Sequence, residues 1–295
     1  NSINLTEEIL HLCKEYNILI STSLDGPAFI HNHNRGKTDS YNRVIEGINK
    51  VRNYLGADKV SALMTTSELS INHPKEIVDN YILNGFNNIF LRPLNPYGLA
   101  LNSTNWNIYF DKFFEFYKQA LNYIIDINIK GKFFVEEFTA ILLRKILTPF
   151  TTGFVDLQSP AGIINSVVVY NYDGYVYASD ESRMLAEYHD YTFRLGHVTD
   201  NYENLFYGDK AQQIALIWGT EFIAGCADCA FQSYCGADPV RNHSTQNDMY
   251  GFRPTSSFCK KHKAIITYLF SLIQSEHDRV MPIFKQWINR NENDF

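Results

Sequence analysis

The hydrophobic residues of the first 92 positions alternate between two periods. Short, continuous, β-branched runs predict buried strands at 17–24, 59–65 and 87–92. Helical spacing of apolar positions predicts the intervening helices at 4–16, at 40–55 and from Pro74 to Gly85. A helix before each strand indicates parallel βα units, joined by right-handed crossovers.

The pattern changes twice in the remainder of the chain. Aromatic and aliphatic stripes predict helices at 106–128 and 134–147, and we interpret these stripes as core. After about residue 150, alternation on both sides of Asn171-Tyr172-Asp173-Gly174 predicts a β-hairpin. Helical patterns follow near 181–188, near 209–219 and at 260–276.

Three βα units cannot close a barrel, and they would leave a bare parallel edge. The chain also begins at Asn1 rather than at a methionine. We therefore expect further strands upstream, which makes this chain a fragment of a longer protein. The change in composition predicts two domains, at 1–148 and 149–295.

Four of the five cysteines gather in one region, with the spacing C-x2-C-x5-C, then 23 residues, then the fourth cysteine. They are Cys226, Cys229, Cys235 and Cys259. Four thiolates suit a tetrahedral zinc site or an iron–sulfur cluster. Disulfides or unligated thiols are a third interpretation. The fifth cysteine, Cys13, lies on the apolar face of a predicted helix and is expected in the core.

Both zinc and iron–sulfur remain open from the residues alone. Zinc ribbons usually carry two C-x2-C pairs, and here the second half supplies only Cys259. His243 and His262 are alternative zinc ligands. Two nearby carboxylates, Asp228 and Asp238, are interpreted mainly as surface residues.

Composition narrows the class of protein. The 295 residues are 45% hydrophobic and carry a net charge of −6. No basic stripe is present, so we expect no nucleic-acid partner. No apolar run approaches the roughly 20 residues of a membrane span, so no membrane partner is expected. Few, clustered cysteines suit a reducing cytoplasm.

Two stretches resemble a radical SAM enzyme with a C-terminal SPASM-type domain. The first is Ser21-Thr22-Ser23-Leu24-Asp25-Gly26-Pro27, followed by His31-Asn32 and Asn34-Arg35. The second runs from Tyr172-Asp173-Gly174 through the cysteine loops, with Arg241-Asn-His, Pro254-Thr-Ser and Phe258-Cys259. This stretch is most similar to the radical SAM maturases of the His-Xaa-Ser modification system. The resemblance implies an α/β fold, namely the C-terminal half of a partial (βα)6 barrel followed by an α+β SPASM-like domain.

Two departures from the family pattern change the expectation. The C-x3-C-x2-C motif that binds the SAM-cleaving cluster is absent, because only Cys13 lies upstream of Cys226. The fragment alone is therefore expected to be inactive. The full SPASM pattern also has a cysteine after the hairpin where this chain has Ser179. We therefore expect one auxiliary [4Fe–4S] cluster, held by the four remaining cysteines.

The resemblance also implies a cofactor site and partners. S-adenosylmethionine (SAM), with a second [4Fe–4S] cluster, is expected in the full-length protein. The residues expected to contact SAM follow the strands: Ser23, Asp25, Arg35, Leu91, Arg92 and Asn95. The implied substrate is a ribosomal peptide or small protein, with His-Xaa-Ser repeats, and a second maturase is an implied partner.

Three of these residues also have an ordinary structural interpretation. Asp25-Gly26-Pro27 is a turn signal, Arg35 suits a solvated surface, and Arg92 suits an ion pair. Two other functions remain open: a zinc-stapled peptide-binding module without enzymatic activity, and an electron-transfer subunit that binds a cluster but no SAM.

Overall fold

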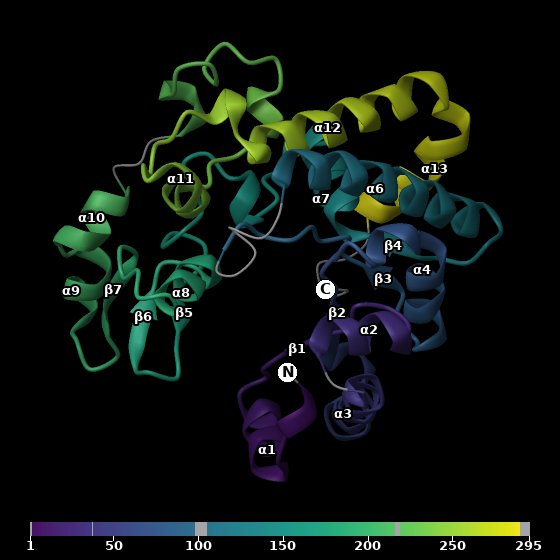
Figure 1. Cartoon of the computed structure of the whole chain (residues 1–295), viewed down its shortest axis with the longest axis horizontal. Helices are drawn as coiled ribbons and strands as arrows, with labels where there is room; N and C mark the ends of the chain where they lie inside the picture. The colour runs from purple at the N-terminus through teal and green to yellow at the C-terminus, as the bar shows by residue number, and fades with distance from the viewer. Residues whose placement is uncertain (1, 37, 98–104, 216–218, 290–295) are drawn as a thin grey trace. The chain divides into compact units, whose positions relative to one another are not determined.

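The structure is a computed structural model, and it describes residues 2–36, 38–97, 105–215 and 219–289 (Figure 1). The chain divides into two compact units. Unit 1 comprises residues 1–94, 111–140 and 271–295, and unit 2 comprises 95–110 and 141–270. Both units draw on separated stretches of the chain. The predicted boundary at residue 148 stays a prediction.

Unit 1 contains parallel strands separated by helices, as the hydrophobic pattern predicts. Strand β1 (Ile20–Ser23) pairs with β2 (Val60–Leu63), and β3 (Asn88–Ile89) pairs with β4 (Val135–Glu136), both in parallel. A parallel bridge between Thr66 and Pro93 connects the two pairs beyond the ends of β2 and β3. The helices before β4 are α1 (Glu7–Glu15), α2 (Ala28–Arg35), α3 (Ser40–Leu55), α4 (Pro74–Leu83) and α6 (Trp106–Ile129).

The fourth strand corrects one expectation. The sequence pattern predicts a helix over 134–147, but the helix α7 spans Glu137–Leu147 and β4 precedes it. Val135 and Glu136 are both fully buried, and each pairs with a residue of β3. A two-residue strand carries too little periodicity to separate it from the helix that follows.

Helix faces supply much of the core of unit 1. Val44, Ile48 and Val51 of α3 are buried at helical spacing. The aromatic stripe of α6 is also core, since Phe113, Tyr117 and others are almost fully buried. Cys13 is 7% exposed, which confirms its expected place in the core. The last helix of the chain, α13 (His277–Ile288), buries Trp287 in the same unit.

Unit 2 is built on a three-stranded antiparallel sheet. The hairpin is confirmed: β5 (Val169–Tyr170) and β6 (Tyr175–Tyr177) flank the predicted turn, and Gly174 has φ +81°. The third strand is β7 (Arg194–His197). The helices of this unit are α8 (Asp180–Ala186), α9 (Tyr202–Tyr207), α10 (Asp209–Ala215), α11 (Pro239–Gln246) and most of α12 (Ser257–Ser275).

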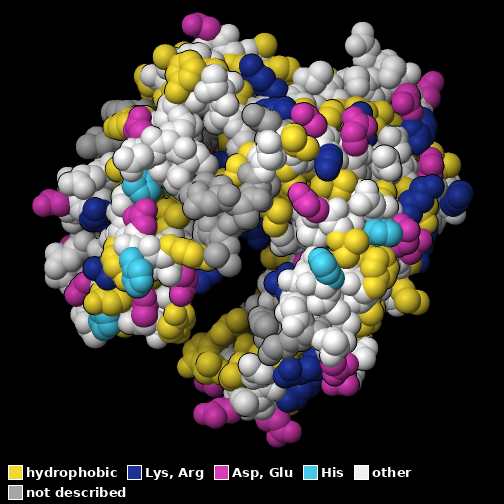
Figure 2. Space-filling view, viewed as in Figure 1, with side chains coloured by type: hydrophobic (Ala, Val, Ile, Leu, Met, Phe, Trp, Pro, Cys, Tyr) yellow, Lys and Arg dark blue, Asp and Glu magenta, His cyan; other side chains and the backbone are white. Residues whose placement is uncertain are grey.

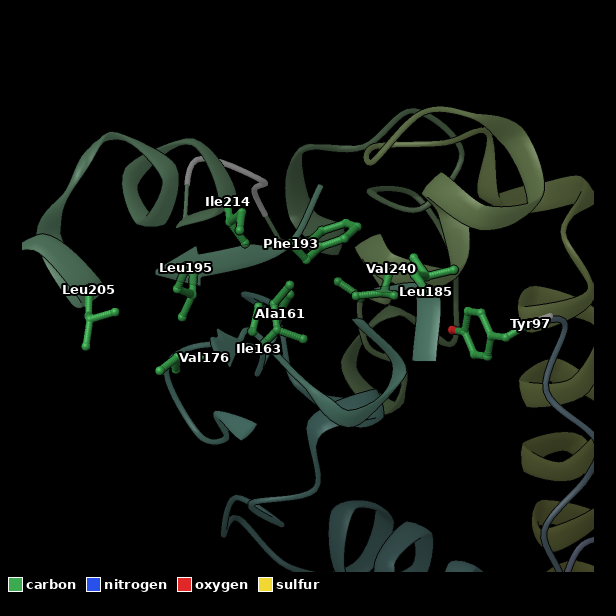
Figure 3. Close-up of a cluster of buried hydrophobic side chains, with 12 residues drawn as sticks. Tyr97, Ala161, Ile163, Val176, Leu185, Phe193, Leu195, Leu205, Ile214 and Val240 are labelled. Atoms are coloured by element: carbon green, nitrogen blue, oxygen red, sulfur yellow. The ribbon is translucent and has the colours of Figure 1, made fainter. Parts of the chain in front are cut away.

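A hydrophobic cluster joins the sheet and helices of unit 2 (Figure 3). Val176 and Leu195 come from the sheet, while Leu185 and Val240 come from α8 and α11. At about 1.5–3 kcal/mol per fully buried large apolar side chain, this cluster is a main source of stability for the unit.

Charged side chains of both signs are interspersed on the visible face of the protein (Figure 2). None of the helices in the described part of the chain combines the length and apolar character needed to cross a bilayer.

Candidate functional site: a four-cysteine pocket

The four clustered cysteines line one pocket in unit 2. Cys226, Cys229, Cys235 and Cys259 all contribute to its wall, around a cavity of about 30 Å³. All four are free thiols and partly buried. The disulfide interpretation is therefore not what the structure shows, and residues up to 33 positions apart in the sequence meet at one place.

Backbone hydrogen bonds hold the first two cysteines in a tight turn. The amide of Cys226 donates to the carbonyl of Ile223 at 2.9 Å, and the amide of Cys229 donates to the carbonyl of Cys226 at 3.0 Å. The amide of Gln232 then donates to the carbonyl of Cys229 at 2.9 Å. These successive turns bring two thiols three residues apart to one side of the loop.

Two glycines let the cysteine loops approach their neighbours closely. Gly225 has φ +76°, and a Cβ atom there would lie 2.5 Å from Cγ of Pro254. Gly236 follows Cys235 directly, and a Cβ atom there would lie 2.3 Å from the carbonyl oxygen of Asp156. Contacts below 3.0 Å are not tolerated, so both positions require glycine in this arrangement.

Lys145 ties the third cysteine to α7. Its Nζ atom donates to the carbonyl oxygen of Cys235 at 2.8 Å and also to that of Leu157. The amide of Ala237 donates to the carbonyl of Gln158 at 2.9 Å, on the other side of the cysteine. Neither contact uses the thiol, so these two hydrogen bonds fix the backbone around Cys235 without engaging its sulfur atom.

The fourth cysteine lies in the first turn of α12. The amide of Cys259 donates to the hydroxyl of Ser256 at 3.2 Å, and this hydroxyl donates to the carbonyl of Arg253 at 2.7 Å. These two hydrogen bonds connect the backbone of Arg253 to the backbone of Cys259 through the Ser256 side chain. A thiolate in the first turn of a helix also benefits from the helix dipole.

Burial favours the protonated form of three of the four thiols. It raises the pKa of Cys235 to about 11, and it also raises the pKa of Cys226 and of Cys259. Ligation of a metal requires thiolates, so loading of this pocket would release protons.

Arg253 brings a positive charge to the same pocket. Its side chain lines the cavity, and the residue is only 3% exposed. No described residue accepts a hydrogen bond from its Nε, Nη1 or Nη2 atom. A buried guanidinium normally has a carboxylate or several acceptors around it. This group therefore fits a pocket that holds a negatively charged ligand.

The two histidines proposed as zinc ligands differ in position. His262 lines the pocket, where its Nδ1 atom donates to the carbonyl of Phe258 at 2.8 Å, and burial lowers its pKa. The Nε2 atom of His243 instead lies 2.8 Å from Oδ2 of Asp190, and His243 does not line the pocket. Within the described ranges, no three Cys, His, Asp or Glu side chains converge as ligands of a single ion.

The nearby carboxylates have separate roles. Asp228 is exposed, as expected for a surface residue. Asp238 is partly buried and caps α11 through a hydrogen bond from the amide of Arg241 at 2.9 Å.

Ser179, where the family pattern has a cysteine, caps α8 by accepting a hydrogen bond from the amide of Ser182 at 3.2 Å. The Ser179 side chain therefore has a structural role at the start of α8.

The residues expected to contact SAM lie mostly in unit 1. Asp25 follows β1 and is fully buried, and both of its carboxylate oxygens bind Arg35, at 2.8 Å each. Its Oδ1 atom also accepts from the amide of Thr65 at 3.1 Å. The pair thus joins the end of β1 to α2 and to the segment after β2. Arg35 is not an isolated surface charge.

The other residues predicted to contact SAM lie at or after the ends of strands in unit 1, except Asn95, which belongs to unit 2. Ser23 is the last residue of β1, whereas Leu91 and Arg92 follow β3. The carboxyl ends of parallel strands are where such sheets bind ligands. Asn95 belongs to unit 2, and its carbonyl accepts from the amide of Tyr97 at 2.9 Å.

Sequence reasoning missed Glu136, which organises the same end of the sheet. Its Oε1 atom accepts from the amide of Leu91 at 3.0 Å, and its Oε2 atom accepts from the amide and hydroxyl of Thr139, at 2.6 and 2.5 Å. Burial raises the pKa of this carboxyl to about 7 against these hydrogen bonds. A glutamate inside a predicted helix gives no signal of such a role.

Comparison with solved structures identifies a protein that shares this fold. The chain matches the solved structure "Native anSMEcpe with bound AdoMet" with a TM-score of 0.70 at 18% identity, over 95% of this chain and 74% of that one. A tagged form of the same protein, also with AdoMet, gives a TM-score of 0.73 at 17% identity, over 98% and 73%. The chain shares the fold of anSMEcpe.

Three further comparisons add less information about this chain. No protein-family model matches the chain. An uncharacterized protein of Methanothermobacter thermautotrophicus is 32% identical over 123 residues, which is 41% of this chain and 44% of that protein. The match thus spans less than half the length of that relative. A third solved structure, of anSMEcpe with AdoMet and the Kp18Cys peptide, has a TM-score of 0.67 at 17% identity, over 95% of this chain and 75% of that one.

Proposed function

We propose that this chain is part of a radical SAM maturase that modifies a ribosomally made peptide or protein. In this proposal Cys226, Cys229, Cys235 and Cys259 hold one auxiliary [4Fe–4S] cluster. The observation that carries it is the single pocket lined by four free cysteines and a buried, unpartnered arginine. The fold shared with anSMEcpe supports the same assignment.

The donor set fits a cluster better than a single zinc ion. Zinc needs four ligands at about 2.0–2.3 Å from one point, and no three ligand side chains of the described residues converge in that way. Four irons spread the same four thiolates around a larger body. With all four positions filled by cysteine, the cluster when bound supplies single-electron transfer and leaves no iron open to substrate.

The residues of this chain would then have defined tasks. The four thiolates hold the cluster, Gly225 and Gly236 permit the loop approach, and Lys145 fixes the backbone at Cys235. Apolar side chains such as Phe258 and Ile266 line the pocket and limit the access of water.

We also propose an AdoMet site at the carboxyl ends of the strands in unit 1. The residues assigned to it are Ser23, Asp25, Arg35, Leu91 and Arg92, and Asn95 stays a prediction of the sequence resemblance. Support comes from their position after β1 and β3, and from AdoMet in anSMEcpe. The cluster that cleaves SAM needs ligands beyond the cysteines of this sequence, so we propose that the chain alone is inactive.

The finer substrate assignment rests on the cysteine loops. Their resemblance to the His-Xaa-Ser system maturases supports a peptide substrate with His-Xaa-Ser repeats and a second maturase as partner. A peptide substrate in general is also supported by the peptide bound in the anSMEcpe structure. Cytoplasmic localisation follows from the reducing environment that free cysteines and a cluster require.

Metal analysis of anaerobically purified protein tests the central assignment. We expect roughly four irons with matching sulfide per chain, and a broad brown absorbance. Protein that is colourless and carries one zinc would refute the cluster and leave the zinc-stapled module. A chain that holds the cluster, combined with an extended chain that fails to cleave SAM, would favour the electron-transfer subunit.

A further inference from the structure

Among the described residues, no carboxylate accepts a hydrogen bond from the buried guanidinium of Arg253. The residue is 3% exposed, and its three guanidinium nitrogens have no acceptor among the described residues. A buried, unpaired charge is costly, because the protein interior replaces little of the hydration that it loses. The cost is recovered when a negative group occupies the pocket that Arg253 lines.

We propose that Arg253 is a positioning residue that raises the reduction potential of the auxiliary cluster. This inference rests on the proposed function, since it assumes a cluster on the four cysteines. A cluster with four thiolate ligands is an anion, and each added electron makes it more negative. A fixed positive charge in the same low-dielectric pocket therefore stabilises the reduced form more than the oxidised form.

The local backbone places Arg253 for this task. Pro254 next to it packs against the loop that begins at Gly225, directly before Cys226. The carbonyl of Arg253 is linked through the hydroxyl of Ser256 to the amide of Cys259. Arg253 is thus tied to the loops of two ligands.

The redox step itself is simple. One electron passes from an external low-potential one-electron reductant to the cluster, and no bond is formed or broken in the protein. In the test described here, dithionite supplies this electron. Arg253 neither gains nor loses a proton, because a guanidinium stays charged.

Lys263 provides a matched control. It lines the same pocket and carries the same charge, but it is exposed to solvent. Water screens an exposed charge, so its removal changes the potential less. The comparison between Arg253→Gln and Lys263→Gln therefore separates a buried counter-charge from a general loss of positive charge.

The experiment is a redox titration with dithionite, monitored by EPR, on the anaerobically reconstituted chain. Arg253→Gln is expected to shift the equilibrium for one-electron reduction at least tenfold toward the oxidised form, which is about 59 mV more negative. Arg253→Lys should recover part of this shift, and Lys263→Gln should change the equilibrium less than threefold. A loaded Arg253→Gln chain with the potential of the control would overturn the proposal.

Loss of loading in the Arg253 variants would not leave the proposal open. The wild-type chain, labelled with 15N-arginine and reduced, should show a 15N coupling to the cluster in pulsed EPR. Absence of the coupling in the wild type would contradict the proposal. A wild-type chain without any cluster would refute the proposed function as well, whereas a loaded chain without this coupling would refute only the role of Arg253.

Discussion

The polar residues of the two units are satisfied in different ways. In unit 1, Asp25 binds Arg35 through both oxygens, and Glu136 accepts four hydrogen bonds from neighbouring groups. In unit 2, the guanidinium of Arg253 is buried without an acceptor among the described residues, and four thiols line the same pocket. The carboxylates of unit 1 thus have partners within the protein, whereas these donors of unit 2 have none in the part of the chain that the structure describes.

The largest effect is expected at the cysteines. Cys226→Ser and Cys229→Ser together remove two of four ligands, so the chain should lose nearly all of its iron, as measured by iron and sulfide analysis. The matched control is Cys13→Ser in unit 1, which should retain the wild-type iron content. A double variant with the iron content of the wild type would show that the cysteine pocket is not the cluster site.

Removal of the Asp25 carboxylate should destabilise unit 1 strongly. Asp25→Ala leaves the amide of Thr65 without its acceptor and Arg35 without its partner, so the free energy of unfolding should fall by about 3–4 kcal/mol in urea denaturation.

The same variant tests the alternative role of this pair. If Asp25 mainly contacts AdoMet, as the sequence resemblance predicts, Asp25→Ala would keep the wild-type stability and lose AdoMet affinity in the full-length protein. Asp39→Ala is a suitable control, because Asp39 is an exposed carboxylate near the start of α3.

The buried Glu136 should make stability depend on pH. Its pKa rises from 4.5 to about 7 on folding, so the folded state binds the proton more tightly. This contribution is complete below pH about 4.5 and is lost as the pH rises through 7. Between pH 5.5 and 8 the wild type should lose about 2 kcal/mol that Glu136→Gln does not lose.

Urea denaturation of both proteins at the two pH values measures this difference. Parallel pH profiles for wild type and Glu136→Gln would show that the carboxyl titrates near its ordinary value, in spite of its burial.

A smaller effect is expected at Gly225. Alanine would have to adopt φ +76° and would press against Pro254, at a cost of about 1–2 kcal/mol. Iron content should fall partly, because the loop that carries Cys226 must shift. Gly131→Ala is the control: Gly131 also has positive φ, but a Cβ atom there meets nothing within 4 Å. Equal iron in both variants would refute the close-approach argument.

Strong periodicity made parts of this fold predictable. The helix at 40–55 agrees with α3, and the hairpin turn lies where its Asp-Gly signal indicated. Helices α2 and α11 were missed because they are short and polar, and α13 was missed because it contains Pro282. In such segments tertiary contacts, rather than local pattern, determine the structure.

The candidate site was likewise only partly predictable from local sequence patterns. Spacing alone predicted that four cysteines would act together, and the structure places all four around one pocket. Arg253 gave no signal, because an arginine in a loop is usually at the surface. Its neighbour Pro254 lies against Gly225, a contact between distant parts of the sequence that no local pattern reveals.

The hydrogen bonds of Lys145 to the backbone at Leu157 and Cys235 anchor one of the cysteine loops. They use the carbonyl oxygen of Cys235 and leave its sulfur atom out of the anchor. A change at Lys145 would therefore act on the cysteine pocket from outside it, through the backbone alone.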